Sequence, residues 1–141
     1  MKEATSYLIG RHDFASFCGS GAQVKTTIRT VTSMDVWRDG DMVTIRISGT
    51  GFLYNMVRII SGTLIEIGNG QYPPERMDKI LKACDRGAAG PTAPAQGLTL
   101  MGIEFSENRN FVENYKKKQL TGKVPYNIIT QCDVVRRCLS Q

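Results

Sequence analysis

The sequence has few of the residues from which metal and hydrolytic sites are built. It contains one histidine, His12, and its four cysteines form no C-x-x-C pair. A structural zinc site needs such closely spaced ligands, so we expect no metal site. No serine or cysteine nucleophile is paired with His12 by spacing, which favours a surface or capping role over general-base catalysis. The cysteines are expected to be reduced thiols rather than disulfides.

Long apolar segments are also missing. No stretch approaches the roughly 18 consecutive apolar residues of a membrane-spanning helix. The first ten residues, MKEATSYLIG, lack the apolar region of a signal peptide. We therefore expect a cytoplasmic protein without membrane association. The short glycine motifs GSG and GNG do not continue into a phosphate-binding loop.

Charge is divided unevenly along the 141 residues. Residues 1–105 carry 11 basic and 10 acidic side chains, whereas residues 106–141 carry 7 basic and 3 acidic ones. The formal net charge of +5 is compatible with binding to nucleic acid through its phosphates. It is equally compatible with a role in solubility and nothing more. We divide the chain into a subdomain, residues 1–105, and a basic C-terminal extension of unknown role, residues 106–141.

The spacing of apolar and β-branched residues predicts an α+β fold in which helices cover one face of an antiparallel sheet. Asp39-Gly40 predicts a hairpin turn between two strands, and Val43, Ile45 and Ile47 are expected on the core face of the second strand. The expected elements are a short helix at 14–17, strands at 24–37 (with a bulge or bend) and 42–48, helices at 50–68 and 74–84, and a strand at 98–105. Residues 124–141 are compatible with a short strand or an amphipathic segment.

Arg58 stands in the middle of the apolar segment GTGFLYNMVRIISGTL, residues 49–64. On a helical wheel it points away from the main apolar stripe, yet its neighbours are residues such as Tyr54 and Ile65 rather than charges. A helix that is apolar on nearly all sides is expected to be covered by other parts of the protein on two opposite sides. A covered arginine needs an anionic partner. That partner is either a functional carboxylate or phosphate, or an ordinary surface pair with Glu66.

The loop GPTAPAQGL, residues 90–98, combines two prolines with small residues. We expect it to be stiff and slim, either as a rigid connector or as a segment that lets a ligand come close. The aromatic side chains leave a similar choice. Phe14, Phe17, Phe52 and Tyr54 either pack in the core or stack on nucleic-acid bases.

Four segments occur in the order found in a known family: GRHDFASFCGSG, IRT, GTGFLYNMVRIISGTLIEIGNG and GPTAPAQGLTLMGIEF. Over about residues 7–105 the sequence closely resembles the C-terminal half of the bacterial tRNA pseudouridine synthase A family, whose members modify uridines in the anticodon stem-loop. FLYNMVR and APAQGL are the most specific matches. The resemblance implies one half of the pseudouridine synthase fold, tRNA as a partner and assembly as a homodimer.

The resemblance also implies a reaction, the isomerisation of uridine to pseudouridine without a cofactor. In the family an aspartate acts as nucleophile, the glycosidic bond breaks, and the base rotates and rejoins through carbon 5. An arginine or lysine pairs with that aspartate, and Arg58 matches this position. The pair would orient the aspartate and keep it ionised. The other positions implied to contact the substrate RNA are His12, Phe14, Phe52, Leu53, Tyr54, Asn55, Pro94 and Leu98.

The sequence departs from the family pattern in one large respect. The nucleophile of the family lies in an R-T-D-x-G-V-H-A segment of the N-terminal half, and a tyrosine that stacks on the target base comes from the same half. Neither segment occurs in these 141 residues. We therefore expect the chain to need an N-terminal half or a complementary chain, and to be inactive alone. The alternatives are a non-catalytic RNA-binding module and a dimerisation module derived from the same fold.

Overall fold

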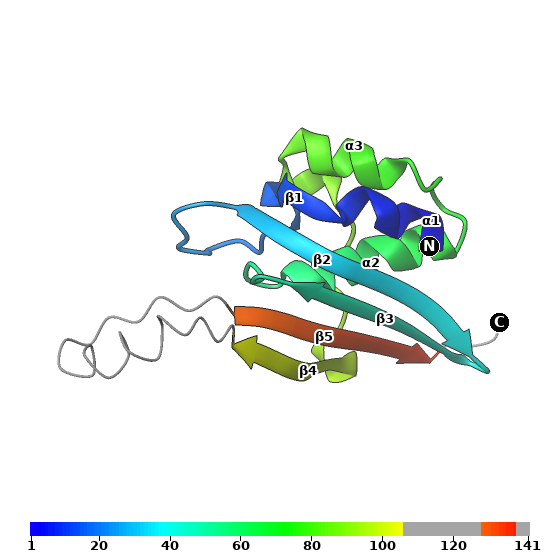
Figure 1. Ribbon diagram of the computed structural model, residues 1–141. Coiled ribbons are helices and arrows are strands. Elements are labelled where there is room, and N and C mark those ends of the chain that lie inside the picture. The colour runs from blue at the N-terminus through cyan, green and yellow to red at the C-terminus, as the bar shows by residue number, and fades with distance from the viewer. Residues whose placement is uncertain (106–127, 138–141) are drawn as a thin grey trace.

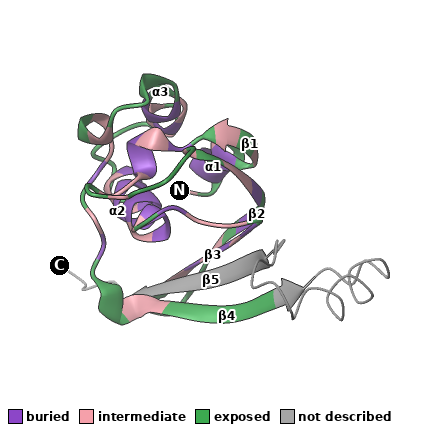
Figure 2. Ribbon diagram, turned by 90° about the vertical axis from the view of Figure 1, so that its left-hand side faces the viewer, coloured by how far each residue is buried: buried purple, intermediate pink, exposed green. Residues whose placement is uncertain are grey.

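The computed structural model describes residues 1–105 and 128–137 (Figure 1). It contains one antiparallel sheet with the strand order β1-β2-β3-β5-β4. The strands are β1 (Gly10–Asp13), β2 (Ile28–Asp39), β3 (Met42–Gly49), β4 (Leu98–Phe105) and β5 (Ile128–Arg137). The helices are α1 (Lys2–Thr5), α2 (Met56–Gly68) and α3 (Arg76–Ala83), with single 3-10 turns at Ser6–Leu8, Ala15–Phe17, Arg86–Ala88 and Ala95–Gly97. All three α-helices lie on one face of the sheet (Figure 2), which confirms the predicted α+β architecture.

Strands β2 and β3 form the predicted hairpin. Gly40 adopts a φ of +55° at the turn, a value that glycine reaches without a Cβ clash. The predicted bulge is present between Val31 and Ser33. The predicted start of this strand at residue 24 is wrong, because the Thr26 hydroxyl accepts a hydrogen bond from the backbone N of Ile28 (3.2 Å). A local side-chain partner of this kind takes the place of a ladder bond at the strand end.

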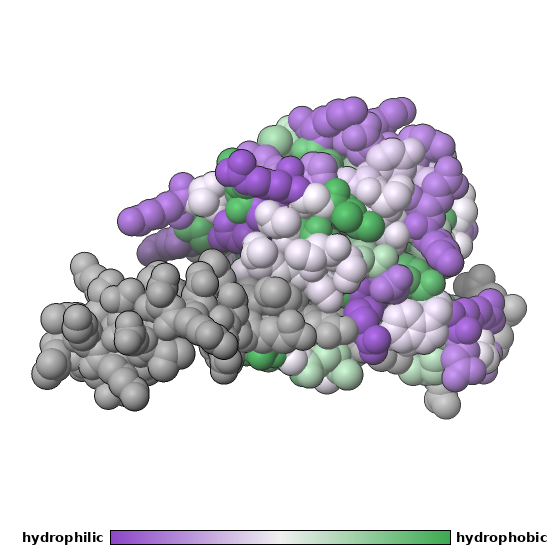
Figure 3. Space-filling view, in the orientation of Figure 1, coloured by the Kyte–Doolittle hydropathy of each residue, from purple (hydrophilic) through white to green (hydrophobic). Residues whose placement is uncertain are grey.

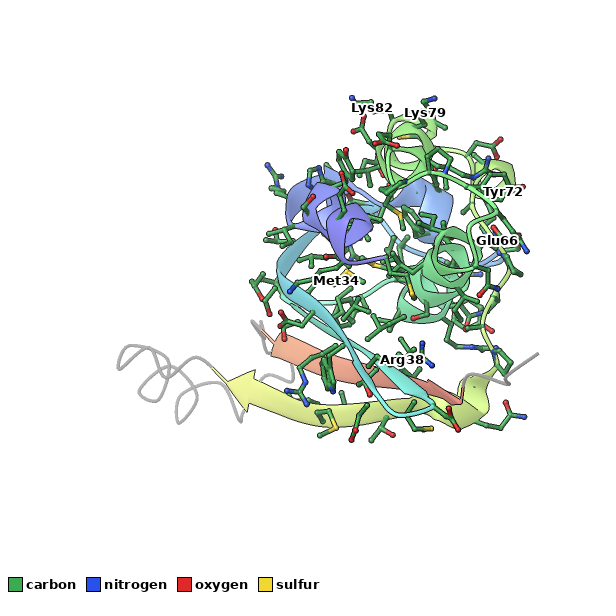
Figure 4. The ribbon with its side chains drawn as sticks, turned by 90° about the vertical axis from the view of Figure 1, so that its right-hand side faces the viewer. Met34, Arg38, Glu66, Tyr72, Lys79 and Lys82 are labelled. Atoms are coloured by element: carbon green, nitrogen blue, oxygen red, sulfur yellow. The ribbon has the colours of Figure 1, made fainter. Side chains whose placement is uncertain are left out.

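The core lies between the sheet and the helical layer, with α2 contributing the largest share. On β3, Ile45 and Ile47 are 2% and 0% exposed, which confirms the predicted inward face for both. Met34 of β2 is also buried and lies between the sheet and the helices (Figure 4). Burying one such side chain contributes about 1.5–3 kcal/mol. The apolar stripe predicted for the helix at 50–68 is buried throughout: Leu53, Met56, Val57, Ile60, Leu64 and Ile67.

Helix α2 begins six residues later than the apolar pattern predicted. Its first residue is Met56, and the preceding Asn55 has a left-handed backbone with a φ of +58°. Asparagine enters this region more easily than most residues because its short polar side chain bonds locally. The carbonyl oxygen of Asn55 already accepts a hydrogen bond from the N of Ile59 (2.9 Å). Residues 50–55 therefore form a loop that leads into the helix.

Strand β5 comes from the C-terminal extension and lies between β3 and β4. Its Cys132 is the register partner of Ile47 on one side and of Leu100 on the other. This strand agrees with one of the two alternatives for residues 124–141, and the remainder of the extension, with its lysine run, lies outside the described residues. Over the part of the chain that is described, no helix has the length and apolar character needed to cross a membrane.

Candidate functional site around Arg58

Arg58 is half-buried in the first turn of α2 and is held by two segments of the chain. Its Nε donates a hydrogen bond to the backbone oxygen of Ala93 (2.7 Å), and its Nη1 donates to Oδ1 of Asn55 (3.0 Å). The backbone N of Ala93 in turn donates to the oxygen of Arg58 (3.0 Å). Two neutral acceptors therefore fix the plane of the guanidinium without compensating its charge.

Among residues 1–103, whose side chains the structure describes, no carboxylate pairs with Arg58. The alternative of a surface pair with Glu66 is therefore wrong. Nη2 of Arg58 has no hydrogen-bond partner among the described residues. Because a half-buried cation gains most from a hydrogen-bonded anion, the free edge of this guanidinium is suited to a carboxylate or phosphate.

Tyr54 lies directly before this arrangement and is 61% exposed. The loop that follows the 3-10 turn Ala15–Phe17 packs against Tyr54. The backbone N of Gly19 donates to the oxygen of Tyr54 (2.8 Å), and a Cβ on Gly19 would lie 2.7 Å from Tyr54 Cδ1. Sequence reasoning missed this contact, because it tested the GSG motif only as a phosphate loop. The available signal was the glycine itself, which permits a close approach of two segments.

Three further residues that the resemblance implied lie within five residues of Asn55 or Ala93 along the chain. Phe52 is half-buried, and a Cβ on Gly49 would lie 3.2 Å from its ring. Pro94 is exposed and directly follows Ala93, the acceptor of Arg58. Leu98 is partly buried against the core. Exposed Tyr54 and Pro94 thus flank Arg58 from the two segments that hold it.

The structure does not place all the implied residues on this surface. His12 is half-buried on β1, where its Nε2 lies 2.9 Å from the oxygen of Ile9 and its ring contacts Phe14 edge-on at 5.9 Å. Phe14 and Leu53 are core residues with 0% and 4% exposure. A ring or side chain without exposed surface offers no face to a base. The packing alternative therefore describes Phe14, as it does Phe17, which is also 0% exposed.

Comparison with known proteins finds similarity over about three quarters of the chain. Residues 4–106 match the family model described as tRNA pseudouridine synthase. The tRNA pseudouridine synthase A of Brevibacillus brevis is 50% identical over 105 residues, which cover 74% of this chain and 43% of the relative. The corresponding values are 54% over 106 residues (75% and 43%) for tRNA pseudouridine synthase A 2 of Clostridium tetani and 47% over 105 residues (74% and 42%) for the Bacillus subtilis protein. The chain thus spans about two fifths of the length of these relatives.

Proposed function

Since the chain belongs to the tRNA pseudouridine synthase family, we propose that it supplies the arginine-bearing part of a site that converts uridine to pseudouridine in the anticodon stem-loop of tRNA. The observation that carries the proposal is the bonding of Arg58. Its guanidinium is oriented by Ala93 and Asn55, and its Nη2 has no partner in the described part of the chain. A cation oriented in this way is suited to receive a carboxylate from outside these residues.

In the proposed reaction an aspartate from the remainder of the enzyme pairs with Arg58. The cation favours the ionised carboxylate and sets its direction of attack. The N1 glycosidic bond of the uridine breaks, the base rotates, and a bond forms through carbon 5. Carbon 5 loses a proton and N1 gains one, so substrate and product are isomers. The reaction therefore requires no oxidant, reductant or group donor.

The neighbouring residues take supporting roles in this proposal. Tyr54, Phe52, Pro94 and Leu98 form the wall beside the base, and Asn55 holds the guanidinium. His12 contributes to RNA binding from β1. Family membership also supports tRNA as the substrate, a homodimer as the assembly and the cytoplasm as the location. Residues 1–105 then form the synthase segment, and residues 106–141 form the basic extension, whose strand β5 joins the same sheet between β3 and β4.

The test is a pseudouridine assay on an anticodon stem-loop RNA. The chain is assayed alone and after co-expression with the part of the Bacillus subtilis relative that it does not match. We expect no product from the chain alone and product from the combination. Product from the pure chain would show that it holds a complete site. A stable complex without activity, together with salt-dependent RNA binding by the chain, would instead favour the non-catalytic RNA-binding module. Self-association without RNA binding at any salt would favour a dimerisation module.

A further inference from the structure

The loop that holds Arg58 crosses helix α2 at very short range. A Cβ placed on Gly62 would overlap the carbonyl oxygen of Pro91, so only glycine fits at this point of the helix. On the loop side, a Cβ on Gly90 would lie 2.9 Å from Cα of Thr63. The backbone N of Gly90 also donates to Oγ1 of Thr63 (3.0 Å). Helix and loop are therefore in backbone contact over two consecutive residues of each.

This crossing determines where the acceptor of Arg58 lies. Ala93 follows Pro91 by two residues. The ring of Pro91 fixes its own φ, and Pro94 restricts the backbone of the preceding Ala93. Hydrogen bonds from Arg86 also stabilise the loop: its guanidinium donates to the oxygen of Gly90 (3.1 Å) and to Oγ1 of Thr92 (3.3 Å). A stiff segment anchored at Gly90 and Pro91 leaves the Ala93 oxygen little freedom relative to α2.

We propose that Gly62 is a positioning residue for Arg58. By lacking a side chain, it lets the Pro91 carbonyl pack against α2, and this places the Ala93 oxygen where it receives the Nε hydrogen of Arg58. The hydrogen bond from Gly90 to Thr63 is the second attachment of the same loop. The catalytic consequence of this inference depends on the proposed function, whereas the geometric claim depends only on these contacts.

The geometric claim is tested by NMR on the ¹⁵N-arginine-labelled 141-residue chain. The signal of the Arg58 Nε hydrogen, assigned by its loss in Arg58→Lys, reports whether the hydrogen bond to Ala93 persists. In Gly62→Ala we expect its exchange with water to accelerate about tenfold or more, as loss of a hydrogen bond to a charged group implies. The matched control is Gly68→Ala in the same helix, where the atoms nearest to the new methyl group belong to the flexible side chain of Met1. This control is expected to leave the exchange rate unchanged.

A milder variant keeps the test decisive if Gly62→Ala does not fold. Thr63→Val removes the acceptor of Gly90 at nearly constant volume, and we expect a smaller acceleration in the same direction. The proposal would be overturned if the Arg58 Nε hydrogen exchanged with water at the wild-type rate in folded Gly62→Ala or in folded Thr63→Val.

Kinetics of the reconstituted enzyme separate the two claims. If Gly62 positions Arg58 for catalysis, Gly62→Ala lowers kcat about tenfold or more and changes KM little, because substrate binding does not require the exact orientation of the guanidinium. Faster Arg58 exchange with unchanged kcat would support the positioning role and contradict the catalytic function proposed for Arg58.

Discussion

Helices α2 and α3 lie on the same face of the sheet, yet their surroundings differ. Nine of the 13 residues of α2 are buried, because the sheet covers one side and the loop at 90–93 crosses the other. Only three of the eight residues of α3 are buried. Its Lys79 and Lys82 point away from the molecule (Figure 4), and hydrophilic side chains gather over this side of the helical layer (Figure 3).

Each helix also provides an arginine to the segment between α3 and β4, and the two arginines are bonded differently. Arg58 of α2 makes a 2.7 Å hydrogen bond to Ala93 and keeps its charge uncompensated among the described residues. Arg76 of α3 lies with Cζ 3.6 Å from the ring centroid of Tyr72, and its Nη2 is 3.5 Å from the oxygen of Ala88, the outer limit of a hydrogen bond. The comparison teaches that a helix covered on both sides can hold a cation in a fixed direction. An amphipathic helix uses its arginine mainly for packing.

The largest expected effect comes from the core of α2. Leu64 is 0% exposed, so Leu64→Ala leaves a cavity and is expected to lower the free energy of unfolding by about 2–5 kcal/mol. Urea unfolding followed by circular dichroism measures this loss. Lys79→Ala on the exposed face of α3 is the control and is expected to change stability by less than about 0.5 kcal/mol. Similar losses in the two variants would contradict the difference between the helices.

The second prediction compares the two arginines in the reconstituted enzyme. Arg58→Ala is expected to reduce turnover at least about 100-fold, or about 2.7 kcal/mol in activation free energy, because the nucleophile loses its orientation. Binding of tRNA should remain nearly intact. Arg76→Ala is expected to leave turnover within a few-fold of the unmodified enzyme. Single-turnover kinetics and filter binding measure both properties, and a near-normal rate for Arg58→Ala would remove this residue from the site.

The third prediction concerns the way α3 is anchored. Ser16 is fully buried, donates to the oxygen of Ile80 (2.6 Å) and accepts from the N of Asp85 (2.9 Å). Ser16→Ala leaves the Ile80 oxygen and the Asp85 N without this hydrogen-bond partner. We expect a loss of about 1–3 kcal/mol in unfolding free energy. Ser6→Ala is the control, since the Ser6 hydroxyl bonds Glu3 at an exposed position. An equal effect of the two substitutions in thermal melts would show that burial of Ser16 is not the cause.

The smallest effect is expected on the outer surface of α3. Lys82 and Asp78 form a 2.7 Å ion pair one helical turn apart, and the Lys82 side chain is 74% exposed. Solvent screens such a pair, so Lys82→Ala should cost no more than about 0.5 kcal/mol, and less at high salt. Urea unfolding at two salt concentrations measures this change. A loss above 1 kcal/mol that salt does not reduce would mean that α3 depends on this surface more than its burial indicates.

The order and type of the main elements were predictable from local patterns. The turn at Asp39-Gly40, the inward face of β3 and the buried stripe of α2 follow from backbone freedom and from periods of 2 and 3.6 residues. The all-round apolar character of α2 also predicted a covering segment on its second side. These features were predictable because each depends on residues close together in the chain.

The site itself was predictable only in part. Resemblance singled out Arg58 as a candidate. A sequence cannot distinguish a phenylalanine that stacks on a base from one that packs in the core, so Phe14 was assigned to RNA although it is buried. The contact of Gly19 with Tyr54 and the place of β5 between β3 and β4 join segments far apart in sequence.

The sequence by itself determined the β2–β3 hairpin, the apolar stripe of α2 and the family, and it singled out Arg58 as a candidate. Only the tertiary structure decided what holds that arginine. Ala93 is 35 residues from Arg58 along the chain, and its oxygen reaches the guanidinium because the loop crosses α2 at Gly62. Hydrophobic periodicity reports the environment of one element at a time. The approach of two backbones depends on how all the elements pack together.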